Sequence, residues 1–332
     1  MTVERITLSV AEARSLATEA CLSAGASHLM TKSLVDATLS AIEVGREELG
    51  FPHFLDYLQS FREGRIDGSA SPRIVHRLPA LIHSDANGGI AQLGFDLVFE
   101  DLVNRARTFG AAIFTQKNSY TAGELGYYVR RLAFDGLVSL AVANSPAVVA
   151  ATPGAKAVYG TNPLAFGVPL SGSERPLVID QSSSATAFVN IVRAASEGRT
   201  IPEGWATDEN GEVTIDPNKA LRGALLAFGG PRGANIALMV EILAAGLSGA
   251  SWSLDAPDFR SGTECPGTGL SIVTLSPDAI GEDFGARVAG QVKRLEQFGV
   301  YIPGRRSSPA AKNGADFITL DAKILTAIRS YI

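Results

Sequence analysis

Two strand-forming segments in the middle of the chain, residues 159–169 and 178–184, each adjoin a cluster of small polar residues. The first reads YGTNPLAFGVP and the second reads VIDQSSS. Clusters of this kind offer free backbone N–H groups and short side-chain donors, which suit the phosphate or the ribose of a nucleotide. The same residue types are also common in plain turns and helix caps. The two segments therefore predict strands that end at either a nucleotide site or ordinary turns.

The composition is that of a large soluble globular protein of about two domains, with 332 residues of which 46% are hydrophobic and 19% charged. A net charge of −5 without a basic run argues against nucleic acid as a partner. Cys21 and Cys265 are far apart, which indicates free thiols in a reducing compartment. Because we find no signal-peptide pattern and no apolar run near ~18 residues, we expect a cytoplasmic protein that does not interact with a membrane.

Helical and strand-like segments alternate along the chain, which favours an α/β fold. Ser9 and Glu12 have the spacing of a capping box, and Gly25 suits the end of the helix that they begin. The helix expected at 234–250 is apolar almost all round, so we expect it in the core or at a subunit interface. We expect the last helix to pack on the first ones. The predicted helices are 9–24, 33–46, 54–63, 97–108, 122–135, 234–250, 279–298 and 321–331, and the predicted strands are 78–84, 111–116, 137–144 and 270–275.

The usual motifs of several enzyme classes are missing. There is no Walker loop, HExxH, CxxC or nucleophile elbow, so metal-dependent hydrolysis and acyl transfer are unsupported and no metal site is expected. Residues 229–233, GGPRG, lack the spacing of a Rossmann fingerprint. With Arg232 before a helix, they suit either an anion site or a glycine-rich turn with a solvated arginine. Residues 304–307, GRRS, form a second basic turn of the same ambiguous kind.

Among the four histidines, His53 is the best candidate for a general acid. It follows a Gly/Pro break at the expected start of a helix, where a side chain can be held rigidly towards a cleft. The alternative is a histidine whose hydrogen bonds are satisfied locally, by Asp56 or the backbone.

Taken together, these segments resemble the type 2 malate/L-lactate dehydrogenase family, which includes ureidoglycolate dehydrogenase, diketogulonate reductase, sulfolactate dehydrogenase and piperideine/pyrroline-2-carboxylate reductase. The resemblance covers most of the chain. It rests on residues 64–66, 85–92, 118–128, 144–146, 160–163, 180–184, 201–206, 208–217 and 229–233.

The resemblance implies an α/β (α+β) fold with a non-Rossmann NAD(P)-binding domain, a mixed or mainly antiparallel sheet, and a mainly helical domain built from both chain ends. Residues 1–75 with about 230–332 would form the helical dimerisation and substrate region, and about 76–230 the interwoven NAD(P)-binding region. It also implies a homodimer that uses NAD or NADP. The expected cofactor-binding residues are Ser145, Thr161, Asn162, Ile179, Asp180, Gln181, Ser182, Ser183, Ser184, Pro231, Arg232, Gly304, Arg305 and Arg306.

The chain departs from the family at its catalytic positions. Family members typically carry Ser-His-Gly followed by an arginine that contacts substrate, whereas residues 48–50 here are Glu-Leu-Gly and His53 falls at the arginine position. A second family histidine is replaced, at the position of Thr121. The candidate catalytic residues are therefore His53, Tyr120, Thr121 and Asp180. Asp180 suits a cationic substrate, a cofactor ribose or a structural cap.

These departures leave three functional hypotheses. The first is NAD(P)H-dependent hydride transfer to the α-carbon of a small 2-oxo acid, or the reverse reaction on a 2-hydroxy acid, with His53 as proton donor. The second is reduction of a cyclic ketimine carboxylate, pyrroline-2-carboxylate or piperideine-2-carboxylate, which can enter as an iminium and needs less help from an acid. The third is a dinucleotide-binding homologue that has lost its chemistry. The choice between NAD and NADP stays open, since Arg232, Arg305 and Arg306 each suit a 2′-phosphate.

Overall fold

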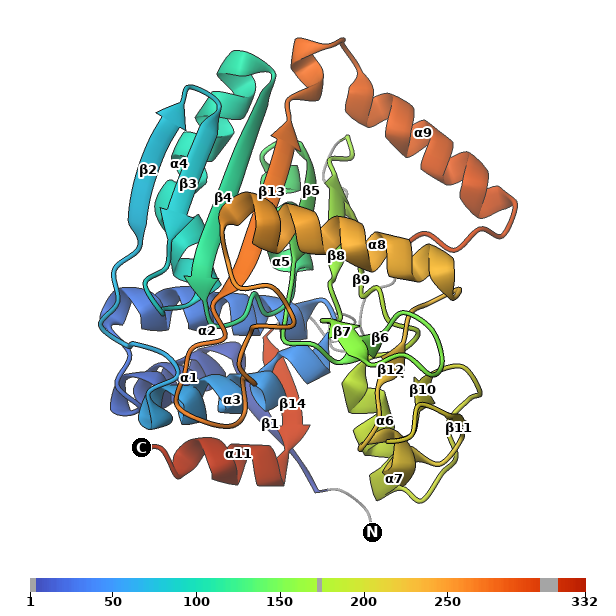
Figure 1. The fold of residues 1–332 in the computed structure, drawn as a ribbon. Helices are drawn as coiled ribbons and strands as arrows, with labels where there is room; N and C mark the ends of the chain where they lie inside the picture. Colours follow the sequence, from blue (N-terminus) through green and yellow to red (C-terminus); the bar gives the residue numbers. More distant parts are fainter. Residues whose placement is uncertain (1–3, 172–174, 305–315) are drawn as a thin grey trace.

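A seven-stranded sheet forms the centre of the molecule (Figure 1) in the computed structural model, which describes residues 4–171, 175–304 and 316–332. β3 and β4 are parallel and the other neighbouring pairs are antiparallel, so the predicted mixed, mainly antiparallel sheet is confirmed. In spatial order the strands are β2 (Arg73–Leu78), β3 (Leu81–Asp85), β4 (Ala111–Ser119), β13 (Thr268–Leu275), β5 (Val138–Ala143), β8 (Leu164–Val168) and β9 (Leu177–Gln181).

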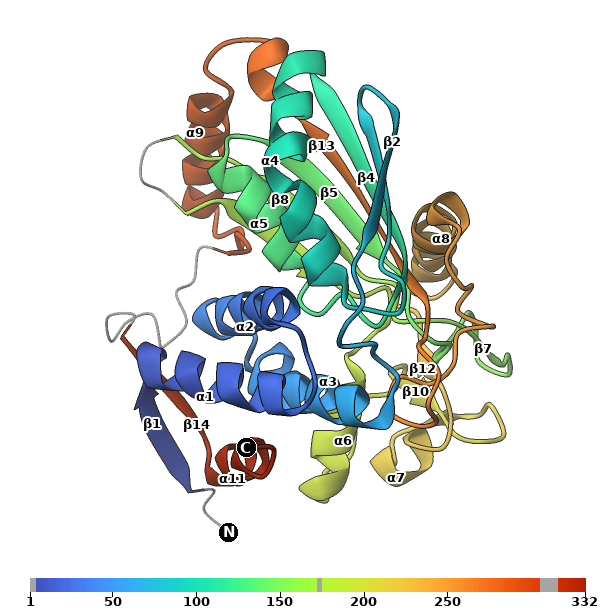
Figure 2. The same ribbon diagram turned by 90° about the vertical axis from the view of Figure 1, so that its left-hand side faces the viewer.

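Helices cover both faces of this sheet. α4 (Ala91–Phe109) and α5 (Gly126–Phe134) pack on one face, where Phe95, Phe114 and Tyr128 form an aromatic cluster with edge-to-face rings. α8 (Pro231–Glu241) lies on the opposite face (Figure 2) and continues into a π-helical turn, η2 (Ile242–Gly246). A short turn, η3 (Pro277–Ala279), and α9 (Phe284–Gln297) follow β13.

A helical layer built from both ends of the described chain lies below the sheet in Figures 1 and 2. β1 (Arg5–Ser9) pairs antiparallel with β14 (Phe317–Asp321). The layer also contains α1 (Val10–Ser23), α2 (His28–Glu43), η1 (Glu47–Leu49), α3 (Phe51–Glu63) and α11 (Ala322–Arg329). α11 packs against α1 and α3 as predicted, and its Leu325 and Ile328 enter the same core as Leu58.

Short-range signals fix several ends of these helices. The capping box is confirmed, because Ser9 Oγ accepts from Glu12 N and Glu12 Oε2 accepts from Ser9 N at 2.7 Å. Gly64 ends α3 with φ +82°, a left-handed conformation in which a side chain would be strained. α2 begins earlier than predicted because Ser27 caps it, with its hydroxyl accepting from Met30 N.

A second, five-stranded sheet lies to the side of the first. Its strands, in spatial order, are β11 (Val213–Thr214), β10 (Ala206–Thr207), β12 (Leu225–Leu226), β6 (Val149–Ala150) and β7 (Ala157–Tyr159), and α6 (Phe188–Ser196) and α7 (Pro217–Ala220) lie beside it. The sequence analysis predicted none of these strands. Ser184 bridges to Ala227, so the end of the segment at 178–184 connects the two sheets.

Several further predicted elements differ from the structure. The segment 78–84, expected to be one strand, crosses a β-hairpin. It contains the last residue of β2, a turn at Pro79 and Ala80, and most of β3. α5 begins at Gly126, four residues after the predicted start, because residues 121–124 form a loop. The helix at 234–250 is not fully buried in this chain, since its apolar residues Leu238, Met239, Ile242 and Leu247 are between 42% and 58% exposed. In the described ranges, no helix is both long and apolar enough to cross a membrane.

Candidate functional site

The start of α3 and the loop after β4 bring two predicted residues together. α3 begins after Gly50 with Pro52 in its first turn, which fixes the direction of His53. His53 Nδ1 lies 2.9 Å from Asp56 Oδ2, and His53 Nε2 lies 3.2 Å from Thr121 Oγ1. His53 therefore pairs with Asp56 through Nδ1 and at the same time contacts Thr121 through Nε2.

The charge of Asp56 assigns the tautomer of His53. Burial would raise the pKa of Asp56, but the hydrogen bond from His53 and the charges of His53 and Arg260 outweigh it and lower that pKa. An ionised carboxylate only accepts hydrogen bonds, so Nδ1 of His53 carries a proton and donates to it. Nε2 is left to hold or release a second proton on the side of Thr121.

Two further residues support Thr121. Tyr57 Oη lies 2.7 Å from Thr121 Oγ1, and Gln92 Nε2 donates to Tyr57 Oη at 3.0 Å. Burial raises the pKa of Tyr57 to about 12, so its hydroxyl stays protonated. Neither Tyr57 nor Gln92 was predicted from the sequence to be functional. Tyr57 was detectable as the residue one helical turn after His53, on the same face of α3.

Tyr120 is not placed as an acid. Its side chain is fully buried, its hydroxyl donates to the Phe259 carbonyl at 2.8 Å, and Ser60 Oγ donates to it at 2.9 Å. Burial also raises the pKa of Tyr120. The expectation that Tyr120 meets substrate does not fit this placement, because the hydroxyl points into the protein and is already engaged.

Asp180, near the end of β9, adjoins the same loop from the other side. Its Oδ2 accepts from Gly126 N at 2.8 Å, and Arg46 donates to its backbone carbonyl at 2.7 Å. Burial, followed by the negative charge of Glu124, raises the pKa of Asp180 to about 6. Glu124 itself is buried in an ion pair with Arg130, 2.5 Å between Oε2 and Nη2. The carboxyl group of Asp180 is thus partly buried and binds a proton at a higher pH than an ordinary aspartate does.

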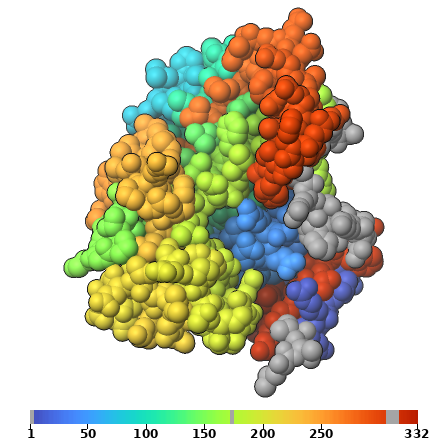
Figure 3. Space-filling model, turned by 90° about the vertical axis from the view of Figure 1, so that its right-hand side faces the viewer, coloured from blue at the N-terminus to red at the C-terminus, as the bar shows by residue number. Residues whose placement is uncertain are grey.

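Figure 3 shows a recess in the middle of one face of the molecule. The blue segment around residue 50, where α3 begins, lies on one side of it, and the yellow-green segment around residues 180–195 lies on another. The segments around residue 50 and around residues 180–195 thus border one hollow.

The two polar clusters of the sequence analysis do meet. Ser183 N donates to the Thr161 carbonyl at 2.8 Å, and Thr161 N donates to Ser145 Oγ at 3.2 Å. Gly160 leaves no room for a side chain, since an added Cβ would lie 2.4 Å from the carbonyl oxygen of Ser145. The turn at 160–163 and the turn at 182–184 therefore form one close-packed unit.

Not every residue of this unit presents its side chain outwards. Asn162 is buried with φ +38°, and its Nδ2 donates to the Ala237 carbonyl and to Glu241. Ser183 is also buried, and its Oγ donates to the Asn162 carbonyl at 2.6 Å. Ser184 donates to the Thr186 carbonyl. These three side chains shape the turns, while Gln181 and, in part, Ser182 remain at the surface.

The start of α8 adjoins this unit, because Phe228 N donates to the Ser183 carbonyl at 3.0 Å. Gly229 and Gly230 have φ of +58° and +64°, and open space faces both of them. No side chain caps the helix at Gly230, and Pro231 occupies its first turn. Arg232 is exposed and forms no ion pair with any residue in the described ranges. Uncapped N–H groups, open glycines and an unpaired guanidinium fit the phosphates of a dinucleotide.

Ile179 and Gly304 lie along β9. Ile179 is in the strand itself, and Gly304, with φ +78°, passes beside it so closely that an added Cβ would lie 3.1 Å from Val178 N. Arg305 and Arg306 lie outside the described residues. Among the residues that are described, no three histidine, cysteine or acidic side chains are grouped so as to hold a metal ion.

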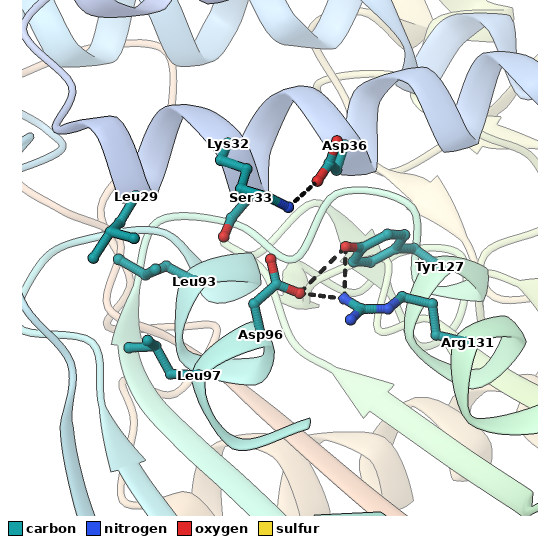
Figure 4. A pocket seen from close by; sticks show the side chains of 9 residues that line it. All are labelled: Leu29, Lys32, Ser33, Asp36, Leu93, Asp96, Leu97, Tyr127 and Arg131. Atoms are coloured by element: carbon teal, nitrogen blue, oxygen red, sulfur yellow. Dashed lines mark hydrogen bonds and ion pairs between the residues drawn. The ribbon is translucent and has the colours of Figure 1, made fainter. Parts of the chain in front are cut away.

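A separate hollow of about 490 Å³ lies between α2, α4 and α5 (Figure 4). Its charged groups are paired with one another: Arg131 with Asp96 and Tyr127, and Lys32 with Asp36 at 2.7 Å. None of the predicted site residues lines this hollow. The candidate site is therefore the cluster around His53 and not this groove.

Comparison with known proteins identifies the scaffold. Residues 8–329 match the sequence profile of the malate/L-lactate dehydrogenase family. The chain belongs to this family. One relative in it, the (2R)-3-sulfolactate dehydrogenase (NADP(+)) of Chromohalobacter salexigens, is 32% identical over 98% of this chain and 97% of its own length. Another, the Δ1-pyrroline-2-carboxylate/Δ1-piperideine-2-carboxylate reductase of Pseudomonas putida, is 35% identical over 85% of this chain and 84% of its own.

A solved member of the malate/L-lactate dehydrogenase family has the same fold. The Δ1-piperideine-2-carboxylate reductase of Pseudomonas syringae superposes with a TM-score of 0.91 at 32% identity, covering 98% of this chain and 100% of that one. The family expected from the sequence is thus confirmed, and with it the expected class of enzyme, a nicotinamide-dependent oxidoreductase.

Proposed function

We propose that this member of the malate/L-lactate dehydrogenase family reduces a small 2-oxo acid to the 2-hydroxy acid with NADH or NADPH, and that His53 donates the proton. The observation that carries the proposal is the placement of His53 between Asp56 and Thr121 at the start of α3. The reverse reaction, oxidation of the 2-hydroxy acid, uses the same groups in the opposite order.

The chemistry explains why a histidine is needed there. Hydride addition to a ketone leaves negative charge on oxygen, and a positioned acid contributes about 10²–10⁴ in rate. Asp56 orients the imidazole ring through Nδ1. The proton that leaves Nε2 for the substrate oxygen is then replaced from solvent, since the His53 side chain is partly exposed.

The cofactor, when bound, supplies the hydride. Its phosphates fit the start of α8 with Arg232, and its remaining polar groups fit the surface of the turns at 160–163 and 182–184. We assign residues about 76–230, together with the start of α8, mainly to this role, and residues 1–75 with the rest of about 230–332 to substrate binding and dimerisation. Ser145, Thr161 and Asn162 act by holding the turns, and Gln181 and Ser182 by direct contact.

A cyclic ketimine carboxylate is the second candidate substrate. Two of the relatives quoted above reduce such imines by name. This chain also lacks both histidines of the family pattern, and a protonated imine accepts hydride without a separate proton donor. Asp180, with Glu124 nearby, would then stabilise the cationic imine.

The working unit is a cytoplasmic homodimer in this proposal. The exposed apolar residues of α8 and η2, with Leu247 directly after η2, support it, since a strip of four such side chains on one helical segment is typical of an interface. The partner of the reaction is a small carboxylate.

The first experiment follows NAD(P)H absorbance with paired panels of 2-oxo acids and cyclic imino acids, for the wild type and His53→Asn. Wild-type turnover of keto acids that falls by about 10²-fold or more in His53→Asn supports the main proposal. Turnover of imines alone, unaffected by the substitution, supports the second candidate. Binding of NAD(P)H without turnover of either panel would mean that the chain has lost its chemistry.

A further inference from the structure

Arg260 is the cation that contacts the His53 cluster. Its Nε lies 3.3 Å from Asp56 Oδ1 and its Nη2 lies 3.3 Å from Asp56 Oδ2. Asp56 in turn holds His53, so Arg260 and the proposed proton donor share one carboxylate. A carboxylate substrate beside His53 would meet the negative charge of Asp56, and a positive group is needed to offset that repulsion.

We propose that Arg260 binds the carboxylate of the substrate and so selects 2-oxo or imino acids over neutral ketones and imines. This inference rests on the function proposed above. It assigns a binding role to the segment 251–267, in which no functional residue was predicted from the sequence.

The guanidinium of Arg260 has free binding capacity. Both contacts with Asp56 are long for charged hydrogen bonds, and they use two of its five N–H groups. The side chain is 54% exposed, so an anion can reach the rest of the fork. A planar guanidinium matches a carboxylate with two parallel hydrogen bonds, which a lysine cannot reproduce.

An aromatic ring positions this guanidinium next to His53. The Arg260 guanidinium lies 4.8 Å from the centre of the Phe259 ring, and that ring packs edge-on against His53 with centroids 6.1 Å apart. The stack favours a cation over the ring face and limits the directions that Arg260 can take. The Phe259 ring thus contacts both the Arg260 guanidinium and the His53 imidazole.

The backbone on both sides of Arg260 is held by buried groups. Tyr120 donates to the Phe259 carbonyl at 2.8 Å, and Arg65, which is 1% exposed, donates to the Gly262 carbonyl at 2.7 Å. Asp258 accepts from the N–H of Arg260 at 2.6 Å. A loop fixed in this way loses little further freedom when a ligand binds, which is what a preorganised binding residue requires. Holding this loop is thus the role of the buried Tyr120 hydroxyl and Arg65 guanidinium, which donate to its backbone carbonyls.

The test compares wild type, Arg260→Ala, Arg260→Lys and a control, Arg222→Ala. Arg222 forms a similar exposed pair with Glu209 and is 57% exposed. In Arg260→Ala we expect the KM for the acid substrate to rise by about 10- to 100-fold, the loss of a charged hydrogen-bonded pair. The KM for NAD(P)H should stay within about 2-fold, Arg260→Lys should recover part of the loss, and Arg222→Ala should match the wild type.

A second measurement does not depend on turnover. Oxamate, an unreactive analogue of a 2-oxo acid, is titrated into the NAD(P)H-loaded proteins by calorimetry, and into wild type beside its uncharged amide, oxamide. Weaker oxamate binding by Arg260→Ala than by wild type supports the proposal, and equal binding overturns it. A fall in kcat with a shifted pH profile but an unchanged KM would also overturn it, because Arg260 would then act only through Asp56. A wild type that binds oxamate through Arg260 but turns over no substrate contradicts the proposed reaction and leaves the Arg260 site standing.

Discussion

At the scale of single residues, Asp180 has the most unusual titration among the groups of the recess. Its carboxyl group is partly buried near Glu124, and these two effects raise its pKa to about 6 from an ordinary value of 3.8. The folded protein therefore holds this proton more tightly than the unfolded chain does. Asp180 contributes most to the free energy of unfolding below pH 4, and that contribution is lost as the pH rises to 6.

Asp180→Asn should remove this pH dependence while keeping the hydrogen bond from Gly126. We expect the wild type to lose about 2 kcal/mol of unfolding free energy from this group between pH 4 and 6, and the variant to lose less over the same range. Urea unfolding at several pH values measures both. Asp67→Asn is the contrasting control, since hydrogen bonds from Ser69 lower the pKa of Asp67 and its contribution runs in the opposite direction. Parallel curves for wild type and Asp180→Asn would contradict the raised pKa.

Sequence reasoning reached some residues of the site and not others, for a physical reason. His53 was detectable because Gly50 and Pro52 mark a helix start, which is a local signal. Arg260 was not, because it meets Asp56 across 204 positions of sequence and lies in a loop without periodicity. The two polar clusters that contain Asn162 and Ser183 were found from the sequence. Whether these side chains face a ligand or the protein interior depends on tertiary packing, which the local sequence pattern does not show.

At the scale of elements, the end of α8 joins three segments through one carboxylate. Buried Glu241 accepts from Asn162 Nδ2 at 2.7 Å and from both the N–H and the hydroxyl of Ser253 at 2.6 Å. The helix changes to π-helical hydrogen bonding at the next residue. Glu241 therefore fixes α8, the turn at 160–163 and the start of the Arg260 loop relative to one another.

Glu241→Ala should both destabilise the protein and weaken NAD(P)H binding. Removing the carboxylate leaves three buried donors unpaired, which lowers the free energy of unfolding by about 3 kcal/mol. Glu241→Gln should lose less, because the amide oxygen still accepts. Denaturant unfolding and cofactor titration test this, with Glu19→Ala on the exposed face of α1 expected within about 0.5 kcal/mol of wild type. Cofactor affinity unchanged in Glu241→Ala would separate this network from the dinucleotide site.

Elements with strong local signals were predicted well, and elements defined by long-range pairing were not. The first helix was placed within one residue at each end because its capping box and following glycine act within one turn. The strands β6, β10, β11 and β12 are two residues each, too short to show any alternation of apolar and polar residues. They exist because their neighbours in the sheet pair with them.

At the scale of the whole molecule, Leu238, Met239, Ile242 and Leu247 form an apolar strip along the α8 and η2 segment. Nothing in the described part of a single chain covers this strip, which a partner subunit would explain. Ile242→Glu should convert the proposed dimer into a monomer, because a charge at the centre of the strip cannot be desolvated there. Light scattering coupled to gel filtration measures the mass. Ile280→Glu is the matched control, since Ile280 is 84% exposed and lies away from the strip. A wild type that is monomeric at micromolar concentration would contradict the assignment.

The pairing of β1 with β14 sets an order of events during synthesis on the ribosome. Ile318, Leu320, Leu325 and Ile328 complete the same core that receives Leu58 and Tyr57 from α3. The helix that carries His53 and Asp56 is translated early, yet its hydrophobic underside stays uncovered until residues 317–329 emerge. A nascent chain of this protein therefore carries an exposed apolar surface for most of its elongation, and a message truncated before β14 yields a product suited to chaperones and proteases instead of catalysis.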